Sequence, residues 1–146
     1  MKKLSLFIIL FGYSSCATSW MLPESAEEVN FFEDKNIGFL SSYEKTKRFK
    51  SVSNRKVYEA IKTGLKRSGF QIKRADFKSG VVIGEHPITW LDWNSMAGVY
   101  FKSEGQDVLV KIKVEGAKDS VIDITKHQQK YRDRILREIL VQLEKH

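Results

Sequence analysis

The sequence predicts an α+β domain in which an antiparallel sheet of four to five strands carries two amphipathic helices on one face. Apolar residues recur at helical spacing in residues 55 to 68 and again in residues 128 to 144. Between these two segments apolar residues alternate with polar ones, which is the period of a β-strand. Short turns separate the alternating runs and favour antiparallel pairing, so the expected order is β-α-β-β-β-β-α.

The first strand and the first helix are expected between residues 47 and 69. Residues 47 to 52 form the strand, after which Ser53 or Asn54 offers a side-chain oxygen to the first backbone N–H groups of the helix. Gly69 follows the helix at the position where a left-handed residue commonly ends one. The helical stripe consists of apolar and small residues at spacings of three and four, namely Val57, Ile61, Gly64, Leu65 and Ser68.

Four extended runs follow the first helix. Residues 70 to 75 and 81 to 83 flank a turn at residues 78 to 80 and are consistent with a hairpin. Residues 96 to 102 form the third run, and Gly105 marks the turn into the fourth. Because the connections are short, neighbouring runs are expected to pair with each other.

The fourth run, residues 108 to 115, has the clearest alternation in the chain. One of its faces is expected to join the core and the other to meet solvent. A turn at residues 116 to 119 then leads to a last strand at residues 121 to 125, before the final helix. The core face consists of Val108, Val110, Ile112 and Val114, and the solvent face of Leu109, Lys111, Lys113 and Glu115.

The N-terminus predicts export from the cytoplasm. Lys2 and Lys3 precede a mostly apolar run at residues 4 to 11, and small residues follow that run. This pattern is typical of a secretory signal, and the run is too short to span a bilayer as a stable anchor. We therefore expect residues 1 to 15 to be removed from the mature chain.

Cys16 stands where a bacterial lipoprotein signal has its lipid-accepting cysteine, and the small Ser15 precedes it, although Tyr13 stands where such signals usually have Leu. The N-terminus therefore resembles a lipoprotein signal. The resemblance implies that Cys16 is acylated. Ala17 replaces the Asp that retains such proteins at the inner membrane, which implies the outer membrane, facing the periplasm. An ordinary secretory signal cut after Ser15 or Ala17 is the alternative.

Charge is segregated along the chain, although the formal net charge is +7. Residues 24 to 34 contain five acids and no basic residue. Residues 45 to 78 contain twelve Lys or Arg, against only Glu59 and Asp76. An acidic leader is therefore joined to a strongly basic helix and hairpin, and the basic part favours anionic partners.

The acidic leader has no sustained apolar period. We predict that residues 16 to 42 are a lipid-proximal tether with a short helix near residues 24 to 32, and that residues 43 to 146 form the α+β domain. The alternative is that the Phe31-Phe32 pair packs onto the domain.

Residues 57 to 84 carry a resemblance to a known family. Their sequence is VYEAIKTGLKRSGFQIKRADFKSGVVIG. It resembles the helix, strand and hairpin of small bacterial envelope lipoprotein domains, among them the helix-grip domains of the accessory lipoprotein of the outer-membrane β-barrel assembly machine. In this pattern Gly69 ends the helix, and Asp76 and Gly80 shape the hairpin turn. The resemblance implies a non-catalytic scaffold or adapter.

The residue types favour binding over catalysis. His86, His127 and His146 lie at no spacing that would make a metal pair, and neither a Gly-rich phosphate loop nor a Gly-x-Ser-x-Gly elbow occurs. The single cysteine, Cys16, excludes an internal disulfide and a multi-cysteine zinc site. We expect no catalytic residue, no metal and no cofactor. A hydrolytic cleft would need a buried carboxylate such as Asp92 to converge with His86.

Two sets of side chains are candidates for binding a partner. Trp90, Leu91 and Trp93 lie between two expected strands, where large aromatic residues are favoured anchors, although they could instead plug the end of the sheet. The second set lies on the first helix and could instead be an ordinary solvated face. It consists of Arg55, Lys62, Lys66 and Arg67.

The sequence thus predicts a lipid-anchored periplasmic adapter that binds an envelope protein or an anionic lipid or lipopolysaccharide surface. Secretion argues against a nucleic-acid partner. The alternative function is a carrier or sensor of a lipid-like apolar ligand. A closed pocket of a few hundred Å³ between the last helix and the sheet would favour the carrier, and a filled core would favour the adapter.

Overall fold

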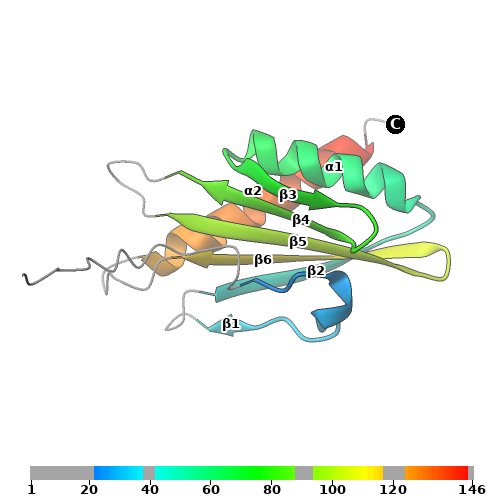
Figure 1. Cartoon of the computed structure of the whole chain (residues 1–146), viewed down its shortest axis with the longest axis horizontal. Helices are drawn as coiled ribbons and strands as arrows, with labels where there is room; N and C mark the ends of the chain where they lie inside the picture. Colours follow the sequence, from blue (N-terminus) through cyan, green and yellow to red (C-terminus); the bar gives the residue numbers. More distant parts are fainter. Residues whose placement is uncertain (1–21, 38–41, 88–93, 117–123, 145–146) are drawn as a thin grey trace, which may run out of the picture.

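The computed structural model describes residues 22 to 37, 42 to 87, 94 to 116 and 124 to 144 (Figure 1). Within these ranges six strands form one antiparallel sheet in the order β1-β2-β6-β5-β4-β3. The elements are η2 (Ala26–Glu28), β1 (Asn36–Ile37), β2 (Ser42–Phe49), α1 (Asn54–Arg67), β3 (Gln71–Asp76), β4 (Val81–His86), β5 (Ser95–Glu104), β6 (Asp107–Gly116) and α2 (Ile124–Glu144).

The predicted fold class is confirmed, because five long antiparallel strands carry two helices in the order β-α-β-β-β-β-α. The two-residue β1 adds a sixth strand at the edge of the sheet. β2 begins earlier than the strand expected at residues 47 to 52, because it pairs with β6 from Ser42 to Phe49. The expectation is wrong for residues 50 to 52, which lie in the connection to α1. The strand expected at residues 121 to 125 is wrong in its described part, since Ile124 and Thr125 belong to α2.

Local signals define the ends of α1 and of the β3–β4 hairpin. The Ser53 hydroxyl accepts a hydrogen bond from the Lys56 backbone N–H at 3.3 Å and caps α1. Gly69 follows α1 with a φ of +90°, as expected for a left-handed helix stop. In the hairpin turn the Asp76 carboxylate accepts backbone hydrogen bonds from Lys78 and Ser79 at 2.9 and 3.1 Å.

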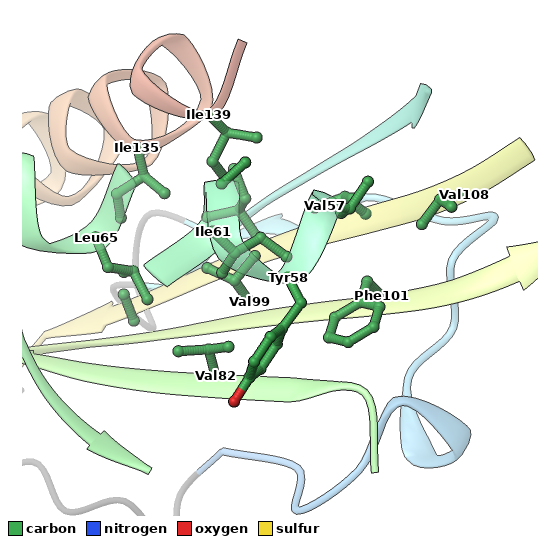
Figure 2. Close-up of a cluster of buried hydrophobic side chains, with 14 of the residues drawn as sticks. Val57, Tyr58, Ile61, Leu65, Val82, Val99, Phe101, Val108, Ile135 and Ile139 are labelled. Carbon is green, nitrogen blue, oxygen red and sulfur yellow. The ribbon is translucent and has the colours of Figure 1, made fainter. Parts of the chain in front are cut away.

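Both helices lie on one face of the sheet, where they bury the main core (Figure 1). Figure 2 shows side chains of α1 and α2 converging above strand residues such as Val82 and Val99. The helices meet at Gly64, where an added Cβ would lie 2.8 Å from Cγ1 of Ile139. Among the described residues, the side chains between the helices and the sheet are therefore buried and closely packed.

The opposite face of the sheet is also covered, which corrects the expectation that it meets solvent. Residues 22 to 37, here called the strap, cross this face (Figure 1). Leu22, Ala26 and Phe31 of the strap form a second buried cluster with β4, β5 and β6. Consequently Leu109 is 4% exposed and Lys111 is 2% exposed, although both were expected to face solvent.

Phe31 is buried and Phe32 is 76% exposed, so the alternative to a free tether holds for one residue of the pair. The short helix expected near residues 24 to 32 is the single 3₁₀ turn η2. The division of the chain after residues 15 and 42 stays a prediction, but the described part of that segment is packed on the domain.

Candidate binding surface

The outer side of α1 brings together the basic residues that the sequence singled out. Arg55, Lys62 and Lys66 are seven and four residues apart, so they lie on one stripe of the helix, opposite its buried side. Arg67 lies nearer α2, where its carbonyl accepts a hydrogen bond from Arg134 at 3.3 Å. The basic face, as we call it, consists of Arg55, Lys56, Lys62, Lys66 and Arg67.

Ion pairs neutralise only a small part of the basic face. The Lys62 ammonium lies 2.8 Å from the Glu59 carboxylate, and both side chains are partly exposed. Within the described ranges no ion pair joins an acid to Arg55, Lys66 or Arg67. An exposed pair such as Lys62 with Glu59 is weak and can be exchanged for another partner. Most of the positive charge of the basic face is therefore available to a partner.

An aromatic cluster that the sequence analysis did not identify as a site borders this face. Phe77, in the β3–β4 turn, is 37% exposed and packs edge-on against Tyr58 with ring centroids 5.3 Å apart. The Arg55 guanidinium lies 5.1 Å from the Phe77 centroid, and the Lys62 ammonium lies 4.7 Å from that of Tyr58. Each ring face attracts the cation above it by about 0.5 to 1 kcal/mol, which holds the side chain in place.

A groove runs beside the basic face, between the N-terminal half of α1 and the C-terminal end of α2. It has a volume of about 440 Å³ and includes Lys56 and Glu59 of α1 and Gln142 of α2 in its lining. Because the groove is open to solvent, it differs from the closed pocket that a lipid carrier requires.

The remaining candidate residues are placed as follows. Trp90, Leu91 and Trp93 lie outside the described residues, as does Cys16. His86 packs as an aromatic ring, with its centroid 4.6 Å from that of Tyr131. The described residues contain no group of three or more His, Cys, Asp or Glu that could hold a metal ion. None of the helices in these ranges is long and apolar enough to cross a membrane.

The buried Lys111 is the second feature that sequence analysis missed. Its ammonium lies 2.9 Å from the Glu44 carboxylate and 3.5 Å from that of Asp34. It also donates hydrogen bonds to the backbone carbonyls of Asn30, at 2.9 Å, and Glu33. One buried cation on β6 therefore holds three strap residues and the neighbouring strand, which fixes the strap on the sheet.

Tyr100 adds a second attachment for the strap. Its ring lies along β5 above Gly98, where any added Cβ would overlap it, and its hydroxyl donates to the Pro23 carbonyl at 3.0 Å. Burial raises the pKa of the Tyr100 hydroxyl far above its ordinary value, so this donor keeps its proton at any physiological pH.

Acid is expected to weaken the strap through Asp34. Burial raises the pKa of its carboxyl, but hydrogen bonds from Thr46 and the charge of Lys111 lower it by more, so the pKa lies below its ordinary value. The stability that the ionised Asp34 carboxyl contributes is therefore present above about pH 4, and it is lost as the pH falls through the folded-state pKa. Thermal unfolding between about pH 3 and 6 should show a smaller pH dependence in Asp34→Asn than in the parent chain.

A pH dependence of unfolding that is identical in Asp34→Asn and the parent would contradict this prediction. Some dependence should remain in the variant. Hydrogen bonds from Ser79 also hold the pKa of Asp76 below its usual range, and a hydrogen bond from Lys73 does the same for Glu85.

The fold defines a class: an α+β domain with two helices on one face of an antiparallel sheet. The chain matches no family model and no curated protein. It is similar to the solved structure of CalU16 from Micromonospora echinospora, with 10% identity, 73% of this chain and 82% of that chain covered, and a TM-score of 0.47. A protein from Arthrobacter aurescens has 7% identity, coverage of 80% and 94%, and a TM-score of 0.48.

The protein TTHA0849 from Thermus thermophilus has 13% identity, coverage of 71% and 94%, and a TM-score of 0.39. The strand order and the two helices of this chain confirm, in its general form, the α+β arrangement that the lipoprotein resemblance implied. Membership of the envelope lipoproteins stays a prediction.

Proposed function

We propose that this chain is a non-catalytic binding or adapter module of a bacterial cell envelope, acylated at Cys16 and held at the outer membrane on its periplasmic side. The observation that carries the proposal is the distribution of the functional groups. The layer between helices and sheet is filled, while cations and a half-exposed aromatic ring gather on the outside of α1.

The filled core supports an adapter over a carrier. Ligand cavities have volumes of about 300 to 1,000 Å³ and bury most of the ligand. Here Ile61, Leu65, Ile135 and Ile139 are fully buried between the two helices and the sheet. Gly64 lets the helices approach so closely that Ile139 contacts its backbone. A lipid-like ligand would therefore have to displace core side chains, which opposes binding.

Acylation of Cys16 has a direct test in living cells. Cells fed an alkyne-bearing fatty acid should label the parent chain, and Cys16→Ala should abolish the label completely because the alanine has no thiol to accept lipid. Ser14→Ala is the matched control, since it also places alanine in the signal region and leaves the cysteine in place. A label that persists in Cys16→Ala would refute lipid attachment at this residue.

A further inference from the structure

We infer that the basic face of α1 docks an acidic protein surface in the periplasm, and not the membrane that holds the chain. The docking of an acidic protein is inferred from described residues, whereas the exclusion of the membrane rests on the proposed acylation of Cys16. It deepens the proposed function because it names the chemistry of the partner and the direction from which that partner approaches.

The first observation is that most of the basic face has no ion-pair partner among the described residues. The exposed acids Glu24, Glu27, Glu28 and Glu33 belong to the strap. The strap covers the face of the sheet opposite the helices. Acidic and basic residues that are close in sequence are therefore separated by the sheet, and the field of α1 is directed outward, toward a partner.

The second observation is the arrangement of the cations. Arg55, Lys62 and Lys66 lie along one helical stripe, and the eleven residue steps from first to last cover about 16 Å at 1.5 Å per step. Phe77 sits at the Arg55 end of this row and offers an apolar contact next to a guanidinium. The pair of Arg55 and Phe77 fits an apolar spot beside carboxylates on a protein surface, because Arg and aromatic residues are enriched in protein interfaces. Lys62 and Lys66 add attraction for acidic residues around that spot.

The third observation is the length of the chain between the lipid and the domain. Leu22 is 3% exposed and packed against the sheet, so only six residue steps separate Cys16 from the folded structure. Fully extended, six residues span about 20 Å. Because the strap is packed on the sheet, the lipid and the folded structure are joined by residues 16 to 22 alone, here called the leash, and not by the expected tether of some 25 residues.

A leash of this length cannot bring α1 onto the membrane. Packed layers lie about 10 Å apart, and a helix with its side chains has a radius of about 5 to 6 Å. From the strap through the sheet to the outer side of α1 is therefore about 25 Å, and the leash would also have to pass around the edge of the sheet. The basic face therefore cannot lie on the membrane that holds Cys16.

The test is site-specific photo-cross-linking of the full, acylated chain in cells. A photoreactive residue at Thr63, beside the basic stripe, should give a cross-link to a protein. Arg55→Glu combined with Lys66→Glu should lower the yield of that cross-link by about tenfold, since two attractions become repulsions. The inference further requires that reversing acidic residues on the captured protein to Lys restores the yield with the doubly reversed chain.

The matched control reverses charge on the opposite face. Lys35 is an exposed strap residue, and Lys35→Glu together with Lys102→Glu makes the same change in net charge without touching α1. This control should leave the cross-link from Thr63 unchanged. An equal loss in the control would overturn the inference, because it would show a response to net charge alone.

Vesicles distinguish a lipid partner. The acylated chain with the photoreactive residue at Thr63 is inserted into phosphatidylglycerol vesicles, and the inference predicts no cross-link to lipid, because the short connection to Cys16 keeps α1 away from the surface. Cross-links from Thr63 to lipid that Arg55→Glu and Lys66→Glu abolish, in these vesicles or in cells, would overturn it. If Cys16→Ala retains the fatty-acid label while the protein cross-link behaves as predicted, the proposed anchor fails and the docking surface stands.

Discussion

Lys111→Met is expected to lower the free energy of unfolding by about 3 to 5 kcal/mol, the usual cost of removing one partner of a buried ion pair. The substitution leaves the buried Glu44 carboxylate without its cation, although methionine fills a similar volume. It also leaves the carbonyls of Asn30 and Glu33 without their donor. Thermal and urea unfolding measure the loss, which corresponds to a decrease in Tm of about 10 to 20 °C.

Lys113→Met is the matched control. Lys113 lies on the same strand and the same face, two residues away, but its side chain is 20% exposed against 2% for Lys111, and among the described residues it pairs with Glu115 alone. Its substitution should therefore cost clearly less than Lys111→Met. Equal effects of the two substitutions would contradict the assignment of Lys111 as the attachment of the strap.

A double variant separates the charge from the packing. Combining Lys111→Met with Glu44→Leu removes both charges of the buried pair, and replacement of a whole buried ion pair by apolar residues is often neutral. We therefore expect the double variant to recover part of the stability lost in Lys111→Met. Asp34 remains without its cation in both chains, but it is partly exposed and hydrated, so its contribution to the loss is smaller.

Loss of the strap would also change the reach of the lipid anchor. With residues 22 to 37 released, the segment between Cys16 and β2 would become a chain of 25 residues instead of a six-residue leash. Such a chain could bring α1 to the membrane surface. Lys111 therefore connects the stability of the second sheet face with the direction in which the basic face points.

The elements with local signals could be predicted from the sequence. The stripe around Ile61, the Ser53 cap and the left-handed Gly69 all depend on residues within a few positions of each other, and the structure confirms them. The same helical spacing placed Arg55, Lys62 and Lys66 on one side of α1. These features need no knowledge of the rest of the chain.

The features that depend on distant segments could not be predicted. Alternation along β6 assigned Lys111 to solvent, and only the strap, some 77 to 81 residues away in sequence, makes that face a second core. Leu22 and Phe31 have no periodic pattern because the strap is neither a strand nor a helix along most of its length. Phe77 likewise joins Arg55 only because the β3–β4 turn lies beside α1.

Gly80→Ala is expected to destabilise the domain far more than Gly105→Ala, although both glycines lie in hairpin turns with a φ of +65°. A left-handed conformation costs an alanine about 1 to 2 kcal/mol at either position. At Gly105 an added Cβ has no neighbour within 4 Å, so nothing further is lost. This pair of glycines therefore separates backbone strain from steric overlap.

At Gly80 the added Cβ would overlap the Phe101 carbonyl oxygen and lie 3.0 Å from Cβ of Ala26. The backbone of β5 would have to move, which would break the hydrogen bond from the Phe101 N–H to the Gly80 carbonyl, 2.9 Å long. The strap would move as well, because Ala26 donates to the Ser79 carbonyl at 2.9 Å. Urea unfolding should therefore show a loss at Gly80→Ala roughly 2 to 3 kcal/mol larger than at Gly105→Ala. Equal losses at the two glycines would mean that the hairpin turn, the strap and β5 are not packed as closely as described.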